Sequence, residues 1–488
     1  MPSWSTLPLT TAVLLFAYCV SRELKRRTLG RTPPGPKGWP IVGNISDIPH
    51  SKSWLTYVEW RKIYGDIVYV EPFGSPTVIL NNLEDIRELL DKRSAITASR
   101  PRMVMANELM GWDWDFVHMP HDDYWRRHRK VFHQYFQQKN IPNYYPTIRR
   151  STANLLNQLA QSPSRFREHI KQLAAATILK LTYDHEVASE NDYYVSLAHR
   201  ALQGLLPVVH IGSSVVDVIP ILKHIPAWFP GASFKRTAQR NAKYSSELRD
   251  VPFSQAKQKM ATNTIEPCFV SDSFKKDGAD EEVVKNAAGI AYLGKPDLQT
   301  ASVIEFFFLA MLRYPEVQAR ARQEIDAVTG GNRLPDFDDR SSLPYVDLII
   351  AELFRWRPTT PLGMHHQSQQ PDTYKGYYFP AGTKALFCVP LGCTHVINCS
   401  HSIPFQDIFS EPEKFRPERF LKENAELDPR SMGGFGYGRR VCPGRYLADS
   451  SAWLAIAQVL AAFTIQPKRD TNDKDILPSL EYGGGVIM

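Results

Sequence analysis

One glycine-rich segment near the C-terminus constrains this chain more than any other feature. Residues 435–444 read FGYGRRVCPG, and an apolar run with helical periodicity follows over residues 446–463. The glycines before Cys442 and the Pro-Gly pair after it bend the backbone tightly around the sulfur. Backbone N–H groups in such a turn can donate to a thiolate, and the N-terminus of the following helix adds positive potential. The segment therefore predicts a loop that presents a cysteine thiolate at the start of a helix.

A thiolate held in this way can be an axial ligand of haem iron. A lone cysteine in a turn is more often a small buried side chain, so Cys442 taken alone leaves both interpretations open. The spacing F-x-x-G-x-R-x-C-x-G specifies five of ten consecutive positions, however, and a pattern of that length rarely arises by chance. Of the two interpretations of Cys442, the whole pattern therefore favours a haem-thiolate site.

Helical periodicity dominates the chain after about residue 83. Short strand-like runs lie at residues 66–70, 77–80, 374–379 and 385–389. The sequence contains no βαβ alternation and no glycine-rich phosphate loop of the Rossmann or Walker type. We therefore expect a mainly α fold with a minor β portion and no built-in nucleotide site. The clearest predicted helices span residues 83–90, 125–136, 146–159, 303–312, 315–328, 345–356 and 446–463.

Composition excludes several classes of protein. With 43% hydrophobic and 22% charged residues, the chain has the profile of a folded protein with a large core. Its six cysteines show no C-x-x-C spacing, which argues against a disulfide scaffold and a structural zinc site. Of the net charge of +7, residues 1–40 carry six basic minus one acidic, or +5, which leaves +2 for the rest. Nucleic-acid binders concentrate basic residues where they meet phosphate, so we expect no nucleic-acid partner.

The N-terminal charge instead follows an apolar run. Residues 2–20 carry no charge, which is enough to span a bilayer with little to spare. The basic cluster from Arg22 to Arg31 would keep the body in the cytosol. A cleaved secretory signal is the alternative, but the basic residues follow the run and no A-x-A site closes it. We predict a membrane anchor at residues 1–27, a Pro-rich linker at 28–45 and a catalytic domain at 46–488.

The segment around Cys442 resembles the haem-binding signature of the cytochrome P-450 family, the haem-thiolate monooxygenases. Residues 352–355, ELFR, match the family's E-x-x-R, which puts a carboxylate and a guanidinium one helical turn apart. Residues 417–420 match its P-E-R-F box, and Trp125 with Arg129 match its W-x-x-x-R helix. Each short motif alone is typical of a solvated helix face. In this order, together with the cysteine segment, they extend the resemblance over nearly the whole chain.

The resemblance implies the cytochrome P-450 fold, with haem b between an oxygen-activating helix and the cysteine-ligand loop. Cys442 would supply the axial thiolate to the haem iron. Glu352, Arg355 and Arg419 would form a structural network on the same side of the haem. The other cofactor-binding residues that it implies are Phe435 of the signature and the haem-propionate partners Trp125, Arg129, His366 and Arg440.

The similarity is to membrane-bound fungal members that oxidise secondary metabolites. It implies insertion of one atom of O₂ into a small apolar organic substrate, with electrons from NADPH-cytochrome P-450 reductase. With the predicted anchor, it implies a single-pass protein of the endoplasmic reticulum membrane whose catalytic domain is cytosolic. Glycosylation sequons at Asn44 and Asn398 would then stay unused.

One departure concerns the oxygen-activating helix, which in the family usually reads A/G-G-x-D/E-T-T/S. Residues 291–302 read AYLGKPDLQTAS, so Asp297 supplies the acid but no threonine follows it directly. Pro296 also removes one helical hydrogen bond. We expect Asp297 and Thr300 to form the catalytic proton-delivery pair, with a wider turn after Pro296 absorbing the altered spacing.

A second departure is a Cys- and His-rich insert within residues 384–411, whose spacing fits no standard zinc site. These departures keep two other hypotheses open. A haem-thiolate isomerase or dehydratase needs no O₂ activation and would tolerate an altered acid–threonine pair. A degenerate relative, or a chain mis-spliced at residues 290–302 and 384–411, would be non-catalytic.

Overall fold

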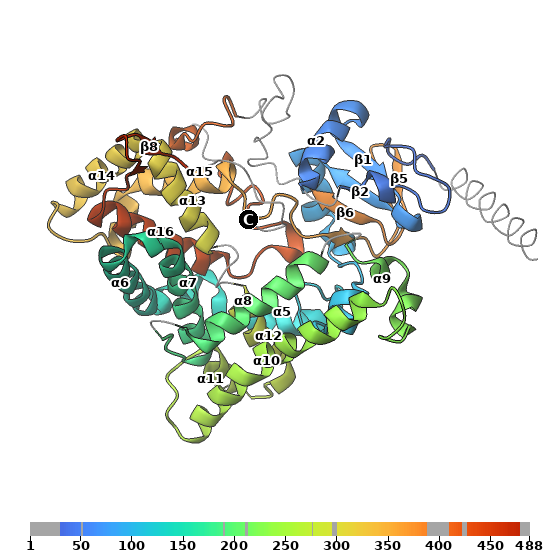
Figure 1. Cartoon of the computed structure of the whole chain (residues 1–488), viewed down its shortest axis with the longest axis horizontal. Coiled ribbons are helices and arrows are strands. Elements are labelled where there is room, and N and C mark those ends of the chain that lie inside the picture. The colour runs from blue at the N-terminus through green and yellow to red at the C-terminus, as the bar shows by residue number, and fades with distance from the viewer. Residues whose placement is uncertain are drawn as a thin grey trace, which may run out of the picture. The chain divides into compact units, whose positions relative to one another are not determined.

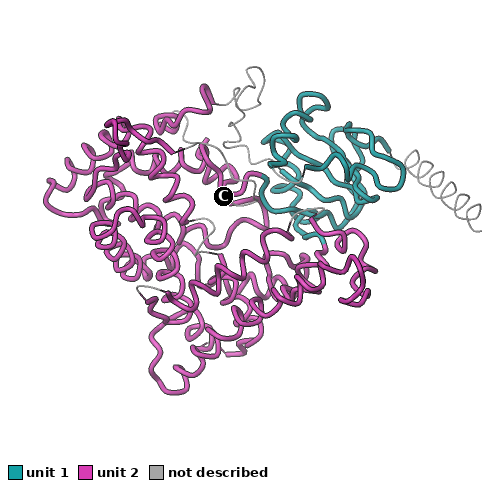
Figure 2. The backbone as a smooth tube through the Cα atoms, viewed as in Figure 1, with its two compact units in different colours: residues 1–101, 362–388 teal, residues 102–361, 389–488 magenta. Residues whose placement is uncertain are grey.

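The computed structural model in Figure 1 describes residues 30–49, 52–188, 191–209, 213–275, 277–294, 300–387, 409–421 and 427–478. The predicted anchor, Asp297 and most of the Cys- and His-rich insert lie outside these residues. Within these ranges, no helix is both long enough and apolar enough to cross a membrane. The chain separates into two compact units (Figure 2): unit 1 comprises residues 1–101 and 362–388, and unit 2 comprises residues 102–361 and 389–488.

Unit 1 is built on a four-stranded sheet whose strands lie in the order β1 (Ile67–Val70), β2 (Thr77–Leu80), β6 (Lys384–Phe387) and β3 (His366–Gln367). Strand β2 pairs antiparallel with β1 and parallel with β6, so that Ile79 lies between Val68 and Leu386. Every residue of β1 and β2 is buried, which explains why both strands read as continuous apolar runs. The helices of this unit are α2 (Ser53–Tyr64), which packs against β1, α3 (Leu83–Ile86) and α4 (Ser94–Thr97).

The strand-like residues 374–379 form a hairpin in unit 1. Strands β4 (Asp372–Tyr374) and β5 (Tyr377–Phe379) pair antiparallel across Lys375 and Gly376. Both turn residues have positive φ, at 50° and 75°, as a two-residue turn matched to the twist of a hairpin requires.

Unit 2 is mostly helical. Its first helices are α5 (Asp123–Phe136), α6 (Tyr145–Gln161), α7 (Phe166–Tyr183), α8 (Tyr193–Leu205), α9 (Val215–Val218), α10 (Ser233–Ala261) and α11 (Phe269–Phe274). They are followed by α12 (Glu281–Leu293), α13 (Thr300–Arg313), α14 (Pro315–Thr329), α15 (Pro344–Trp356), α16 (Arg445–Ala462) and the short strands β7 (Lys468–Arg469) and β8 (Asp475–Ile476).

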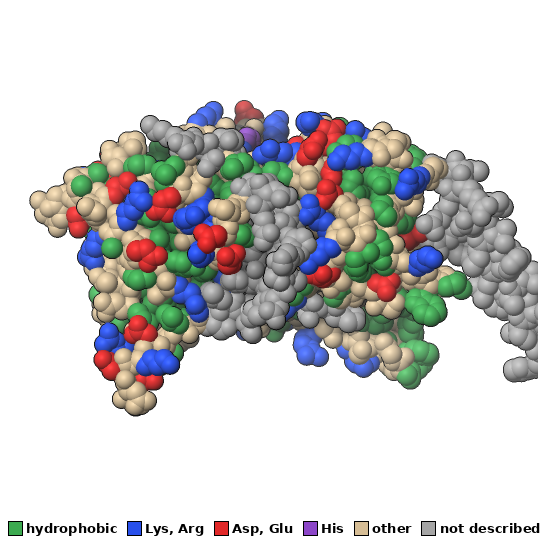
Figure 3. Space-filling model, turned by 90° about the horizontal axis from the view of Figure 1, so that it is seen from above, with side chains coloured by type: hydrophobic (Ala, Val, Ile, Leu, Met, Phe, Trp, Pro, Cys, Tyr) green, Lys and Arg blue, Asp and Glu red, His purple; other side chains and the backbone are tan. Residues whose placement is uncertain are grey.

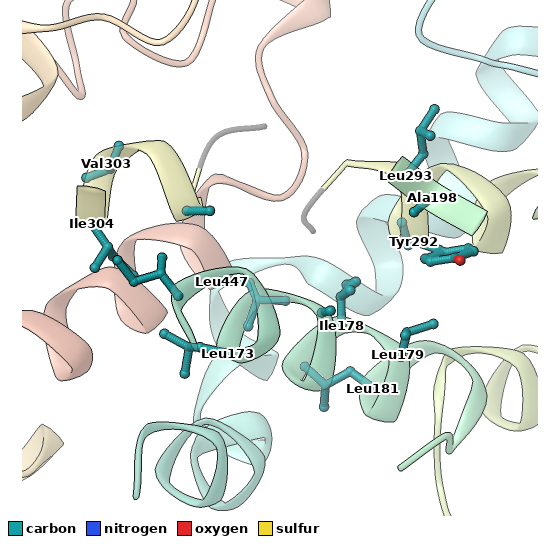
Figure 4. Packing of buried hydrophobic residues seen from close by; sticks show 14 of the residues in the cluster. Leu173, Ile178, Leu179, Leu181, Ala198, Tyr292, Leu293, Val303, Ile304 and Leu447 are labelled. Carbon is teal, nitrogen blue, oxygen red and sulfur yellow. The ribbon is translucent and has the colours of Figure 1, made fainter. Parts of the chain in front are cut away.

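The core of unit 2 lies around α7 and α16. Helix α7 packs against α6, α12 and α13, and α16 packs against α6, α13, α14 and α15. Figure 4 shows part of this core, where Leu173 and Ile178 of α7 lie among apolar side chains of α12, α13 and α16. Burying a leucine or isoleucine side chain contributes about 1.5–3 kcal/mol, so a cluster of this size dominates the stability of the unit.

The structure confirms the predicted mainly α fold with a minor β portion. Six of the seven predicted helices correspond to α5, α6, α13, α14, α15 and α16 within a few residues. The predicted helix at residues 83–90 is shorter, because α3 ends at Ile86 and a wider π-type turn continues from Arg87 to Lys92.

Helix α12 is approached closely by the loop that precedes α5. A Cβ atom on Gly289 would lie 2.7 Å from the six-membered ring of Trp114, so only glycine allows this contact. The ring of Trp114 stacks on Trp112 at 5.3 Å, and its Nε1 donates to Ser245 Oγ of α10 at 2.9 Å. The loop is therefore fixed against α12 and α10.

The surface is of mixed charge. On the face drawn in Figure 3, Lys and Arg side chains alternate with Asp and Glu side chains. Exposed ion pairs such as Arg127–Asp280 and Lys257–Glu281 also join opposite charges at the surface of unit 2. Pairs of this kind add little to stability but keep a surface soluble.

Candidate functional site

The glycine-rich segment forms a tight loop around Cys442. The backbone N–H of Cys442 donates to the carbonyl of Phe435 at 2.8 Å, which closes the loop. Gly433, Gly436 and Gly438 all have positive φ, at 104°, 82° and 55°. A Cβ atom on Gly433 would lie 2.1 Å from the Tyr437 ring, so this position requires glycine. The predicted bend is present.

Cys442 lies just before α16, which begins at Arg445 with Gly444 as its N-cap. Its side chain is partly exposed and carries a thiol rather than a disulfide. Because the unsatisfied N–H groups at a helix N-terminus carry partial positive charge, this position favours the thiolate. The loop therefore presents the sulfur as the sequence predicts.

Arg129 reaches the same loop from α5. Its Nη2 donates to the carbonyl of Val441 at 2.5 Å. Burial lowers the pKa of Arg129 to about 10, and a negative charge at Cys442 opposes this shift. Within the described ranges, Arg129 forms no ion pair with a carboxylate. It is thus a half-buried cation whose charge no described carboxylate balances.

Arg440 packs on Trp125, which lies one helical turn before Arg129 on α5. Arg440 donates to the carbonyls of Phe116 and Met119 at 3.2 and 2.7 Å. Its guanidinium stacks 4.2 Å from the centroid of the Trp125 ring. The indole Nε1 of Trp125 is buried and has no hydrogen-bond partner in the described part of the chain. Guanidinium groups and an unsatisfied indole N–H are donors of the kind that bind anions.

Glu352, Arg355 and Arg419 form one buried ionic network. Glu352 accepts from Nε and Nη2 of Arg355 at 2.6 and 2.8 Å, and from Nε of Arg419 at 3.2 Å. Its Oε1 also accepts from the backbone N–H of Arg416 at 2.7 Å. All three side chains are at most 2% exposed. The network ties α15 to the short helix Pro417–Phe420.

A second ionic cluster on α15 was not predicted from the sequence. Asp347 accepts from Arg340 Nη2 at 2.6 Å and from Arg430 Nη1 at 3.0 Å. The same two arginines reach Asp449 of α16 at 2.8 and 3.1 Å, and Arg430 also binds Asp428. These arginines lower the pKa of Asp347 although burial opposes them. The cluster fixes the start of the cysteine loop to α15 and α16.

The sequence contains a weak signal for this cluster. Asp347 interrupts the apolar run of α15, and a carboxylate among apolar residues favours a cationic partner. One of its two partners, Arg340, lies in the preceding segment, but the other, Arg430, lies 83 residues away, and no periodicity links two positions so far apart.

The remaining predicted site residues lie in different places. Phe435 is buried, with its ring 4.9 Å from that of Phe354 on α15. His366 belongs to unit 1, where its Nδ1 donates to the carbonyl of Thr97 at 3.0 Å. Thr300 is the first residue of α13; its Oγ1 is buried and has no hydrogen-bond partner among the described residues. Asp297 lies outside the described residues.

A protein-family model described as "Cytochrome P-450" matches residues 33–486 of the chain. A cytochrome P-450 monooxygenase of Armillaria gallica is 36% identical, over all of this chain and 95% of the relative. The monooxygenase ple1 of Rhodocybe pseudopiperita is 38% identical over 98% of this chain and 90% of its own length. The monooxygenase claR of Ampulloclitocybe clavipes is 35% identical, with 99% and 87% covered.

The chain belongs to the cytochrome P-450 family. It is a cytochrome P-450 monooxygenase, an oxidoreductase. Membership implies a haem cofactor, a redox partner and a substrate.

The described residues fit a haem group. Haem carries two carboxylates, and the unsatisfied Trp125 Nε1 and the unbalanced guanidinium of Arg129 are donors of the kind that carboxylates accept. The Cys442 thiolate at the start of α16 is a suitable iron ligand. In this cytochrome P-450, the hydrogen-bond donors for the carboxylates lie near the sulfur ligand for the iron, because Arg129 contacts Val441, the residue next to Cys442.

Replacing Glu352 by glutamine should destabilise this cytochrome P-450 strongly. Glutamine keeps the shape but leaves two buried guanidinium groups without their carboxylate, which typically costs about 3–5 kcal/mol. We expect the free energy of unfolding in denaturant to fall by that amount. Glu59→Gln, which removes an exposed pair with Lys62, is the matched control and should change it by less than about 1 kcal/mol. Equal effects of the two substitutions would contradict the assignment.

Proposed function

We propose that this cytochrome P-450 monooxygenase binds haem b through Cys442 and inserts one oxygen atom from O₂ into a small, apolar, secondary-metabolite-like substrate. Its electrons would come from NADPH-cytochrome P-450 reductase. The observation that carries the proposal is that the Cys442 loop contacts Arg129 and carries Arg440, which stacks on Trp125. When bound, haem supplies the iron at which O₂ is activated and the substrate is oxidised.

The residues of the chain have separate tasks in this proposal. The Sγ atom of Cys442 ligates the iron, and the N-terminus of α16 keeps it deprotonated. Arg129 and Arg440 bind the haem carboxylates, with Trp125 Nε1 as a further donor. A pKa of about 10 leaves Arg129 protonated at neutral pH, so its charge persists although it is half-buried. Glu352, Arg355 and Arg419 hold the scaffold beside the cysteine loop, and Phe435 packs it against α15.

His366 is a further partner proposed for a haem carboxylate. Its Nδ1 donates to the Thr97 carbonyl at 3.0 Å, which fixes the orientation of the ring. The proposal for His366 rests on the family resemblance and on this fixed orientation.

Cys442→Ser should abolish the absorption band that is typical of reduced, CO-bound haem with a thiolate ligand. A serine hydroxyl is not a thiolate donor, so the iron loses its sulfur ligand. The measurement is the difference spectrum of the reduced protein with CO. Cys268→Ser is the matched control, because Cys268 is buried at the N-cap of α11, where serine fits well. An unchanged spectrum for Cys442→Ser would refute the ligand assignment.

Thr300 and Asp297 are proposed as the proton-delivery pair. The buried, unsatisfied Oγ1 of Thr300 supports the first half of this pair, since a hydroxyl in a dry site can hold a proton for transfer. Thr300→Ala should divert electrons to hydrogen peroxide and lower the product formed per NADPH about tenfold or more, because the proton path is lost. The spectrum of the reduced, CO-bound protein should not change.

The controls for Thr300 separate the competing assignments. Thr300→Ser keeps the hydroxyl and should stay coupled. If Thr300→Ala is silent and Ser302→Ala uncouples the reaction, Ser302 is the proton donor instead. If neither substitution matters and turnover proceeds without NADPH, the isomerase or dehydratase hypothesis replaces the monooxygenase mechanism.

We place the protein at the endoplasmic reticulum membrane through residues 1–27. The segment Val215–Phe229 supports a further, shallow contact with lipid, because it exposes Val215, Ile221 and Trp228 by 63%, 70% and 79%.

Deleting residues 1–27 should release most of the protein from microsomes under a carbonate wash, since no described helix can span a bilayer. Any fraction that remains should be released when Ile221 and Trp228 are also changed to serine. Full retention of the doubly substituted, truncated protein would contradict the single-anchor topology.

A further inference from the structure

Outside the N-terminal basic cluster, positive charge is concentrated in one segment of the chain. Residues 199–246 contain six basic residues and one acidic residue, a net charge of +5. Since residues 41–488 carry +2 in all, the rest of that range has a net charge of −3. The same segment contains the exposed apolar side chains of Val215–Phe229, for which a shallow contact with lipid is proposed above. The segment therefore combines cationic and exposed apolar side chains.

Three of these cations form a stripe along α10. Arg236, Arg240 and Lys243 are exposed and follow one another at intervals of four and three residues, which places them on one face of the helix. Ala238 and Ser245, each 1% exposed, lie on the opposite face. At the rise of an α-helix the stripe extends over about 10 Å. It therefore faces away from the protein interior.

The basic stripe begins beside the exposed apolar segment. Arg236 Nη1 donates to the carbonyl of Ala227 at 2.7 Å, and Lys235 Nζ donates to the carbonyl of Ile225 at 2.8 Å. Trp228, the next residue after Ala227, is 79% exposed. These hydrogen bonds hold the first turn of α10 against the backbone that carries the apolar side chains.

The charge of the stripe is largely available to an external anion. Arg240 forms no ion pair or hydrogen bond with any residue that the structure describes. Lys243 lies 3.6 Å from Glu247, but its side chain is 72% exposed, so this pair is weak. A fourth cation lies beside the stripe, because exposed Arg200 of α8 stacks 5.6 Å from the centroid of the Tyr244 ring.

We propose that the basic stripe of α10 binds the headgroups of anionic phospholipids, so that this protein docks preferentially on a negatively charged membrane surface. The proposal rests on the lipid contact proposed above and names the class of lipid that strengthens it. Insertion of apolar side chains does not by itself distinguish neutral from anionic lipids. Each basic side chain near an anionic surface, by contrast, strengthens binding about fivefold, within a range of about 8 Å at physiological salt.

A lipid surface fits this segment better than a soluble polyanion does. A nucleic acid would bind the cations but leave the neighbouring side chains of Ile221 and Trp228 in water, although they are 70% and 79% exposed. A bilayer accommodates both, since its headgroups bind the cations and the boundary with the acyl chains takes up the apolar side chains.

The test compares membranes of different charge. Full-length, haem-loaded protein is placed in nanodiscs of phosphatidylcholine alone or of phosphatidylcholine mixed with phosphatidylserine. The measurement is amide hydrogen exchange of residues 215–246. We expect phosphatidylserine to slow exchange in residues 215–229 about fivefold or more, because anionic lipid favours the docked state. High salt should remove the difference between the two kinds of disc.

Variants of α10 assign this response to the stripe. Arg240→Gln combined with Lys243→Gln should abolish the response to phosphatidylserine and leave exchange in neutral discs unchanged. Arg236 is retained because it also holds the apolar segment. Glutamates at positions 240 and 243 should reverse the response, since they repel anionic lipid. Lys139→Gln combined with Arg165→Gln removes the same charge from exposed positions on other elements and is the matched control.

Several outcomes would overturn the proposal. Equal protection in neutral and anionic discs, or an equal response in wild type and the Arg240–Lys243 variant, refutes it. A response to phosphatidylserine but not to phosphatidylglycerol at equal charge would assign a site for one headgroup instead. Protection that appears only after NADPH-cytochrome P-450 reductase is added would assign the stripe to a protein partner.

Failure of the functions proposed above gives different results. If the lipid contact itself is absent, residues 215–229 show no protection in either kind of disc. If the haem-thiolate assignment fails, the wild-type protein lacks the thiolate-type CO spectrum, whatever its response to lipid charge.

Discussion

The structure around the cysteine loop depends on one buried carboxylate. Glu352 is 0% exposed, and a charged group in that position is tolerated only because Arg355 and Arg419 bind it from two sides. Asp347, on the same helix, is held in the same way by Arg340 and Arg430. Each carboxylate thus fixes a different segment to α15: Glu352 fixes residues 416–419, and Asp347 fixes residues 428–430.

Ion pairs of this kind specify geometry more than they add stability. An apolar replacement of similar volume can be as stable, because the desolvation of two charges offsets most of their attraction. An apolar contact, unlike a hydrogen-bonded ion pair, does not require its partners to meet in one particular orientation. Arg430 can satisfy Asp347, Asp428 and Asp449 only in one arrangement of the chain. This arrangement positions the residues that enter the loop of Cys442.

The arginines of unit 2 differ in whether their charge is balanced. Asp428, Asp449 and Asp347 raise the pKa of Arg430, whereas burial lowers the pKa of Arg129 to about 10. A buried guanidinium with carboxylate partners supports the fold. A guanidinium group without carboxylate partners is more costly to bury. Such a group is typical of a site where an anionic ligand supplies the missing charge.

Local patterns predicted much of this site from the sequence. The bend around Cys442 follows from its glycines and proline, and α5 follows from its periodicity and from Asp122, which caps Trp125 N at 2.8 Å. The pairing of Glu352 with Arg355 follows from helical spacing. Such features depend on residues that are close in sequence.

Features that depend on tertiary packing could not be predicted. Helix α7 is buried on several sides, so its apolar residues do not form the single stripe that reveals an amphipathic helix. The approach of Trp114 to Gly289 joins residues from separate elements, and nothing in either local sequence indicates it. The pairing of Asp115 with His118 has helical spacing, but these residues lie in a loop, where that spacing carries no information.

The polar side chains that α5 and the cysteine loop contribute to the proposed haem site are donors. Trp125 Nε1 and the guanidinium groups of Arg129 and Arg440 can only donate, and they therefore suit carboxylates. A carboxylate can only accept. An anionic group bound at this place would therefore satisfy the donors that are costly to leave without a partner in the protein alone.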